Sequence, residues 1–235
     1  MESPATSTRR IPADLADWRP QRFGSGNAKN VVDPIIEPGW NGLRTIARVG
    51  FGSGGSDVEL IDEDGRPLVD LPEITSAIAA AARASSLILD GYLTRQATRP
   101  SEGLMLKSPE APSVADLTTQ LFFGSAGQRK RQELVRARQA EAAGGSIAFV
   151  AIDLLLVDDE PVVGVPLLER KRLLEGVLDE GELVRRTTFV RPPVDPWIGT
   201  WRSIGFSQLA YKAANSRYRP GQPNPEWATA RIPQR

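Results

Sequence analysis

Residues 35–44 of the chain read IIEPGWNGLR. Pro38 fixes its own φ, and Gly39, Asn41 and Gly42 tolerate positive φ, so the stretch on its own predicts a tight turn. A carboxylate, Glu37, precedes this turn, and a cation follows it at the end of the stretch. Short motifs match by chance, so the segments downstream must decide whether the turn also has a function.

The composition indicates one or two globular units with a sizeable core, because 40% of the 235 residues are hydrophobic and 25% are charged. The formal net charge is zero, so any basic surface for nucleic acid must be local. The chain contains no cysteine and no histidine, which excludes disulfides, thiolate nucleophiles, histidine general bases and zinc sites built from these residues. We find no signal peptide and no membrane-spanning run, and we expect a cytoplasmic protein.

The basic residues are dominated by arginine. Five of the 29 are lysines, namely Lys29, Lys107, Lys130, Lys171 and Lys212. This short set restricts any mechanism that needs a nucleophilic amine.

Segments typical of strands and of helices are mixed along the chain. Apolar and β-branched runs predict strands at residues 45–49, 58–61, 87–89, 147–157, 183–190, 209–213 and 228–232. Helical spacing predicts helices at residues 72–84, 128–143, 167–178 and 196–204. In the helix at 167–178 we expect five apolar side chains to face inward: Leu167, Leu173, Leu174, Val177 and Leu178. The order lacks strict strand–helix alternation, which favours an α+β fold.

Residues 37–44 resemble the nucleotide-binding signature of ATP-dependent DNA ligases, which usually reads Glu-Pro-Lys-aromatic-Asp-Gly-x-Arg. Five positions match: Glu37, Pro38, Trp40, Gly42 and Arg44. In that family the lysine is the nucleophile that takes AMP from ATP. Its place is held by Gly39, and the aspartate's place by Asn41.

Later segments resemble further signatures of the same family, in the same order. Residues 58–70 are similar to the Ser-Arg-Asn-Gly segment, with Glu63 at the arginine position, and residues 89–92 to Leu-Asp-Gly-Glu, with Tyr92 for the glutamate. Residues 149–155 are similar to the Val-Ala-Phe-Asp-Leu-Leu strand. Ile152 replaces its adenine-stacking aromatic, and Asp153 is expected to be a hydrogen-bonded structural acceptor. The helix start at 166–171 also resembles the family's.

Three final matches extend the resemblance to residues 31–232. Residues 205–212 are similar to Gly-x-Glu-Gly-Val-Val-Ala-Lys, with Ser207 at the metal-associated glutamate and Lys212 matching the lysine. Residues 218–227 are similar to the Tyr-Arg-Pro-Gly…Trp run. The two phosphate-binding lysines of the last strand correspond to Thr229 and Arg231.

The resemblance implies an ATP-grasp-like nucleotidyltransferase fold, with a nucleotide cleft between two packed antiparallel sheets and flanking helices. It divides the chain into an irregular N-terminal lead-in, residues 1–30, and a ligase-like adenylation domain, residues 31–235, without the C-terminal OB-fold domain of family ligases. The implied nucleotide-binding positions are Glu37, Trp40, Asn41, Arg44, Ile152, Lys212 and Arg231.

Adenylation needs a nucleophilic amine, carboxylates for a divalent metal, and cations for the triphosphate. Gly39 supplies no amine, so no catalytic residue is predicted. Asn41, Tyr92 and Ser207 replace polar or acidic partners, so no metal ligand is predicted. The resemblance implies ATP and magnesium as cofactors, but we expect their binding to be weakened. We therefore interpret the chain as an inactive homologue, retained as a nucleotide- or nucleic-acid-binding or accessory module in DNA repair and recombination.

Two alternatives remain open at this point. One is an active ligase or nucleotidyltransferase with a relocated lysine such as Lys29, which requires the lead-in to fold into the cleft. The other is an unrelated α+β scaffold without a two-sheet cleft at Trp40. The candidate partners are a nucleotide, DNA or a repair protein, and no membrane. The arginines of the helix at 128–143 lie on opposite sides, which favours a solvated helix over a DNA-tracking one.

Overall fold

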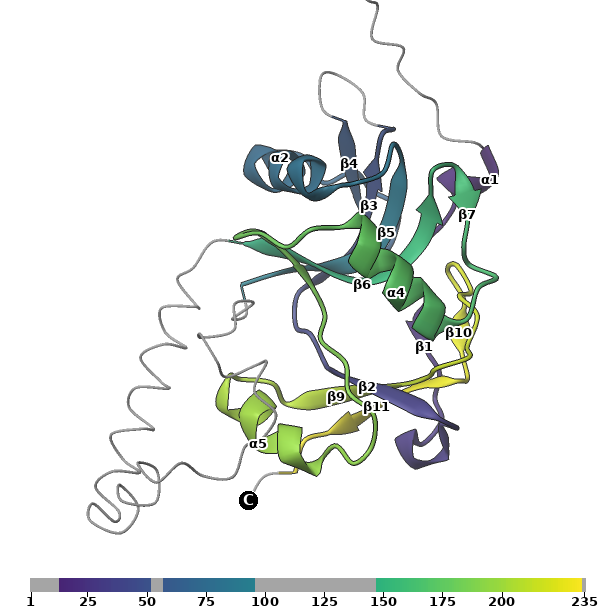
Figure 1. Cartoon of the computed structure of the whole chain (residues 1–235), viewed down its shortest axis with the longest axis vertical. Helices are drawn as coiled ribbons and strands as arrows, with labels where there is room; N and C mark the ends of the chain where they lie inside the picture. Colours follow the sequence, from purple (N-terminus) through teal and green to yellow (C-terminus); the bar gives the residue numbers. More distant parts are fainter. Residues whose placement is uncertain (1–12, 52–56, 96–146, 234–235) are drawn as a thin grey trace, which may run out of the picture.

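Two sheets stacked face to face form the framework of the protein (Figure 1). The computed structural model describes residues 13–51, 57–95 and 147–233. The helix predicted at 128–143 lies outside these ranges. Among the helices within them, none is long and apolar enough to cross a membrane.

The larger sheet has six strands, and its centre is the most apolar part of the described chain. In spatial order these are β4 (Val58–Asp62), β3 (Leu43–Val49), β5 (Leu87–Thr94), β6 (Ala148–Val157) and β7 (Glu160–Pro161), with β8 (Val184–Arg186) also paired to β6. All pairs are antiparallel except β6 with β8. Nine of the ten residues of β6 are buried, as its apolar run predicts.

The smaller sheet has three antiparallel strands in the order β11 (Trp227–Arg231), β9 (Gln208–Ala213) and β2 (Pro34–Pro38). The helix α5 (Asp195–Ser203) packs against it through Trp201, which joins a buried cluster with Ile36 and Leu209. A two-residue parallel pair, β1 (Arg22–Phe23) with β10 (Pro223–Asn224), lies at its edge.

Helices α2 (Pro72–Ala81) and α4 (Leu167–Val177) cover the six-stranded sheet. Successive residues of β6 point to opposite faces of the sheet. Phe149 therefore packs in a cluster with residues of the two helices, whereas Val150 and Ile152 pack with residues of β2 and β9. The α+β class and the two packed antiparallel sheets with flanking helices are confirmed.

Several predicted boundaries differ from the structure. The helix predicted to reach residue 84 ends at Ala81, and the strand predicted at 183–190 stops at Arg186, because the chain then crosses to the smaller sheet, where Val190 pairs with Ile36. Strand β5 continues past residue 89 to Thr94. In α4, Leu173 is exposed, because it lies off the buried stripe formed by positions 167, 170, 171 and 174.

The lead-in is more regular and more tightly packed than predicted, over the part that the structure describes. It contains α1 (Ala13–Ala16), β1 and a 3-10 helix, η1 (Ala28–Asn30). Leu15 and Ala28 are buried, and the backbone N–H of Gln21 donates a hydrogen bond to the Tyr218 hydroxyl at 2.8 Å. Long-range contacts, rather than local propensity, hold these residues. The division of the chain at residue 30 stays a prediction.

Candidate functional site

The predicted turn is the link that joins the two sheets, since residues 39–42 run from β2 to β3. The N–H of Gly39 donates to the carbonyl of Gln208 at 2.8 Å, and a Cβ at this position would lie 2.8 Å from the Gln208 Cβ and 2.9 Å from its carbonyl oxygen. Gly42 has φ 151°, and a Cβ there would lie 2.3 Å from the Leu93 carbonyl oxygen. Close backbone packing therefore requires glycine at both positions.

A pocket of about 180 Å³ opens between the sheets beside this link, and we term it the cleft pocket. Five of the seven predicted nucleotide-binding residues line it: Glu37, Trp40, Asn41, Ile152 and Lys212. Phe23, Tyr92 and Thr229 also contribute to its wall. Trp40 is buried, packs edge-to-face on Phe206 at 4.8 Å and donates its indole N–H to Thr187 Oγ1 at 2.8 Å.

The other two predicted residues lie elsewhere. Arg44 lines a neighbouring cavity, and Arg231 is exposed at the end of β11, outside the lining of the cleft pocket. Lys29, the candidate relocated lysine, is exposed on η1 and is not a lining residue either. The lead-in reaches the cleft through Phe23 instead, which packs against Trp227 at 5.7 Å.

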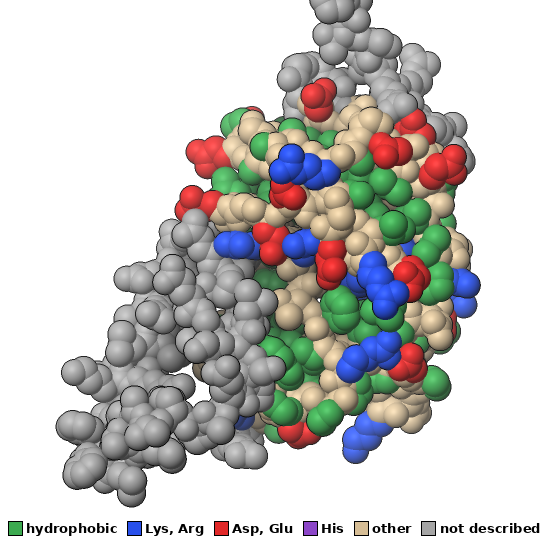
Figure 2. Space-filling model, in the orientation of Figure 1, with side chains coloured by type: hydrophobic (Ala, Val, Ile, Leu, Met, Phe, Trp, Pro, Cys, Tyr) green, Lys and Arg blue, Asp and Glu red, His purple; other side chains and the backbone are tan. Residues whose placement is uncertain are grey.

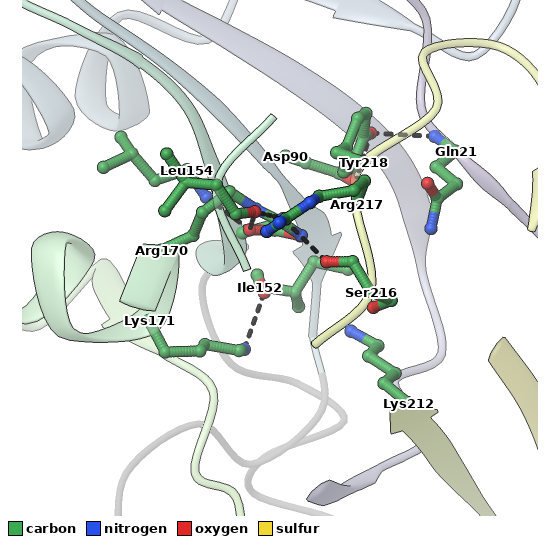
Figure 3. A network of polar contacts seen from close by, with 12 residues as sticks. Gln21, Asp90, Ile152, Leu154, Arg170, Lys171, Lys212, Ser216, Arg217 and Tyr218 are labelled. Carbon is green, nitrogen blue, oxygen red and sulfur yellow. Dashed lines mark hydrogen bonds and ion pairs between the residues drawn. The ribbon is translucent and has the colours of Figure 1, made fainter. Parts of the chain in front are cut away.

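Glu37 is held between two buried lysines. Lys212 Nζ lies 2.7 Å from Glu37 Oε2, and Lys171 Nζ lies 2.6 Å from Glu37 Oε1; all three side chains are at most 2% exposed. Lys171 also donates to the Ile152 carbonyl at 2.6 Å (Figure 3). Burial lowers the pKa of Lys171, a shift that Glu37 opposes and Lys212 reinforces.

The sequence reasoning missed Lys171. One signal could have found it, because Lys171 lies four residues after Leu167 and three before Leu174, on the stripe of α4 that faces the core.

A second buried ion pair fixes α4 to β6. Arg170 donates from Nε to Asp153 Oδ1 at 2.8 Å and from Nη2 to Asp153 Oδ2 at 2.7 Å, and both side chains are fully buried. Arg170 also donates to the carbonyls of Val165 and Ser216, and Asp153 accepts from the Leu154 N–H. The expectation that Asp153 is a satisfied structural acceptor is confirmed.

Arg44 is likewise paired inside the protein. Its Nε and Nη2 each donate to Asp90 at 2.6 Å, and its Nη1 donates to the Tyr92 hydroxyl at 2.8 Å. Asp90 also accepts from the Tyr218 hydroxyl at 2.7 Å. Burial and the negative charge of Asp90 raise the pKa of Tyr218 well above its usual value. The arginine is thus held by a carboxylate and a phenol rather than left open to a phosphate.

The residues around the cleft do not fit a magnesium ion. The buried carboxylates Glu37, Asp90 and Asp153 are each bound to lysine or arginine, and the resemblance puts Tyr92 and Ser207, which carry no carboxylate, at the family's glutamate positions. Within residues 13–51, 57–95 and 147–233, no group of three or more acidic side chains is arranged to hold a metal. On the face shown in Figure 2, basic and acidic side chains alternate, so no single-sign patch forms there.

Comparison with known proteins relates the chain to DNA ligases. No protein-family model matches it. It is 28% identical over 191 residues to DNA ligase C2 of Mycolicibacterium smegmatis, an alignment that covers 78% of this chain and 46% of that protein. The chain thus spans about half the length of this curated relative.

Two solved structures share the fold. The ligase domain of M. tuberculosis LigD has a TM-score of 0.59 at 18% identity and covers 92% of this chain and 60% of that one. A mycobacterial DNA ligase D complexed with ATP and MES has a TM-score of 0.56 at 19% identity, with 91% and 60% coverage. The chain has the fold of the adenylation domain of ATP-dependent DNA ligases, and its sequence resembles that of a DNA ligase over most of its length.

Proposed function

We propose that this chain is a ligase-type adenylation domain that binds a nucleotide non-covalently and does not form a lysine–AMP bond. The observation that carries the proposal is Gly39 at the position of the family's nucleophilic lysine. The Cβ direction of Gly39 is closed by Gln208 on the neighbouring strand, so the backbone there is built for glycine. The reacting amine that the resemblance expects is therefore missing at position 39.

The shape and chemistry of the cleft pocket support retained binding of a base. Its volume of about 180 Å³ suits a single ring system, since a cavity of roughly 150 Å³ holds benzene. Phe23, Trp40 and Tyr92 supply aromatic walls. Glu37 and Lys212 also line the pocket but are paired with each other at 2.7 Å, so a base would gain mainly from burial of its rings. We propose that the base occupies this pocket.

Mass spectrometry after incubation with ATP and magnesium tests the covalent half of the proposal. The expected mass is that of the unmodified chain, and a shift by one AMP that survives denaturation would contradict it. Equilibrium binding of ATP, followed by the fluorescence of Trp40 and its neighbours, tests the other half. Thr229→Phe, an exposed position on the pocket wall, is expected to abolish binding, whereas Arg172→Gln, at an exposed arginine of α4, leaves it unchanged.

The second candidate is an active nucleotidyltransferase with a relocated lysine. Lys171 is the residue that favours it, because burial lowers its pKa and a neutral amine is the nucleophilic form. Against it, Lys171 is 2% exposed and its Nζ is engaged by Glu37 and by the Ile152 carbonyl. An AMP adduct mapped to Lys171, and lost in Lys171→Met, would establish this candidate.

We propose further that the domain, residues 31–235, acts as an accessory module in DNA repair or recombination, with DNA or a repair protein as its partner and the cytoplasm as its location. The similarity to DNA ligases supports the proposed role in DNA repair or recombination. With zero formal net charge, DNA binding would run through local arginines and weaken steeply with salt. Tight binding to DNA that is insensitive to salt would contradict this role for the arginines.

A further inference from the structure

A second cavity, of about 630 Å³, adjoins the cleft pocket, and the two share Phe23 and Tyr92 as lining residues. We term it the arginine cavity, because Arg19, Arg22 and Arg44 all line it. Two of these arginines come from the lead-in, whose β1 strand is held in place by β10. None of the ligase signatures includes this segment.

The arginines of the lead-in differ from Arg44 in their partners. Arg44 is held by Asp90 and Tyr92. Among the described residues, Arg19 donates to the backbone carbonyls of Ala16 and Trp18, at 3.1 and 3.0 Å. Arg22 is exposed, and within the described parts of the chain it forms no ion pair. The cavity therefore contains two guanidinium groups that form no ion pair with any described carboxylate.

Gln21 lies between these arginines in the sequence, also lines the cavity and supplies a third, independent feature. Its Oε1 accepts from the Arg219 N–H and from Asn224 Nδ2, which fixes the orientation of the amide. Its Nε2 is buried and has no hydrogen-bond partner. A buried donor without a partner typically costs about 1–3 kcal/mol, so a ligand oxygen that reached Gln21 Nε2 would relieve this cost.

Acidic side chains restrict the charge that the cavity accepts. Glu63 and Asp64 form part of its lining, and Asp64 is paired with Arg66 at 3.0 Å. These carboxylates would repel a long polyphosphate more than a single phosphoryl group. Planar guanidinium groups bind the oxygens of such a group through paired N–H donors.

We propose that the arginine cavity binds a phosphomonoester through Arg19, Arg22 and the Gln21 amide. Where a nucleotide supplies the phosphate, this assignment rests on the proposed function, since the base would occupy the adjoining cleft pocket. The lead-in then provides the phosphate contacts of this chain. They would replace the two phosphate-binding lysines of the family's last strand, whose positions correspond to Thr229 and Arg231.

NMR titration with inorganic phosphate tests the cavity without any nucleotide. The Gln21 side-chain NH₂ and the Arg22 Nε–H are followed at constant ionic strength. Saturable shifts of both are expected. Arg22→Gln should weaken phosphate binding by at least about tenfold, because a hydrogen bond to a charged group is worth roughly 1.5–3 kcal/mol. Arg172→Gln, an exposed arginine on α4, is the matched control and should leave the affinity unchanged. Shifts that are linear and equal to those caused by chloride would overturn the proposal.

Nucleotide and DNA probes then identify the source of the phosphate. AMP should bind more tightly than adenosine, and Arg22→Gln should remove this difference while leaving adenosine binding intact. A 5′-phosphorylated oligonucleotide that displaces phosphate better than its 5′-hydroxyl form would assign a DNA end as the source. If phosphate saturates the cavity but AMP binds no more tightly than phosphate, the cavity assignment holds and nucleotide binding fails. An AMP preference that survives in Arg22→Gln and in Arg19→Lys contradicts the cavity assignment alone.

Discussion

The variant Gly39→Lys places a lysine where the resemblance expects the family's nucleophile. We expect this variant to be less stable than the native protein and to form no AMP adduct. The new Cβ would lie 2.8 Å from Gln208 Cβ and 2.9 Å from its carbonyl oxygen, both closer than such contacts allow. That carbonyl accepts the Gly39 N–H at 2.8 Å, so β2 and β9 must separate to make room. Overpacking of this kind typically costs about 1–3 kcal/mol. In a chain of this size that corresponds to a drop in Tm of roughly 2–12 °C.

The loss of stability is measured by thermal and urea denaturation, with Gly176→Lys as the matched control. Gly176 lies in α4, and a Cβ there would meet nothing within 4 Å. Lysine is a better helix former than glycine by up to about 1 kcal/mol, so the control should be neutral or slightly stabilising. Gly39→Ala should show the same loss as Gly39→Lys, since the clash begins at Cβ.

The same variant should form no AMP adduct. Transfer requires neutralisation of the developing phosphate charge, and by the sequence resemblance Asn41, Tyr92 and Ser207 replace polar or acidic partners of the family. Losing one well-placed electrostatic partner commonly costs about 100- to 1,000-fold in rate. Mass spectrometry after incubation with ATP and magnesium checks this. A Gly39→Lys protein as stable as the native chain, carrying AMP on the new lysine, would refute both the steric and the electrostatic reasoning.

Three further outcomes are expected. Asp153→Ala should destabilise the fold by about 3–5 kcal/mol in urea denaturation, because it leaves Arg170 buried without its carboxylate, whereas Asp153→Leu combined with Arg170→Met should recover much of the loss. Burial lowers the pKa of Lys171 in the folded protein below its ordinary value of 10.5. Between these two pKa values the unfolded chain keeps a proton that the folded chain has lost, so the free energy of unfolding rises with pH. Over this interval the native protein should therefore gain stability relative to Lys171→Met. The raised pKa of Tyr218 has the opposite sign, so stability should fall above about pH 10 in the native protein and less so in Tyr218→Phe. Urea denaturation at a series of pH values checks the predictions for Lys171 and Tyr218. If the free energy of unfolding of a variant depended on pH as that of the native protein does, the pKa shift of the replaced residue would not be the cause.

Most of the longer strands and helices were predictable because their signals are local, but strand β2 was not predicted and its residues were read only as the approach to a turn. The apolar run of β6 and the spacing of Ile74 and Ile78 in α2 depend on burial of one segment against a sheet, whatever that sheet's connections. The ends were less predictable. The strand that follows α4 is cut short at Arg186 by a crossing to β2, a contact that no local pattern contains.

The candidate site was predictable only as far as the resemblance reached. The segments that carry Glu37, Trp40, Ile152 and Lys212 do meet at one pocket. The contacts of these residues could not be predicted from the sequence, because the partners lie far apart in it. Lys212 is 175 positions from Glu37, and Tyr218 is 197 positions from Gln21. The lead-in was missed for the same reason, since its Pro, Ser, Arg and Gly content says nothing about a binding surface elsewhere.

Charge pairing explains how the cleft tolerates so many buried ions. Glu37, Asp90 and Asp153 together meet four cations: Lys171, Lys212, Arg44 and Arg170. Each of these cations must be stripped from a carboxylate before it can bind a phosphate, and breaking such buried pairs is strongly unfavourable. A ligand in the cleft pocket therefore gains most from ring burial, and its phosphate gains most where cations are unpaired. Arg19 and Arg22, which line the adjoining arginine cavity, form no ion pair with a described residue, and for that reason we propose that the lead-in provides the phosphate contacts.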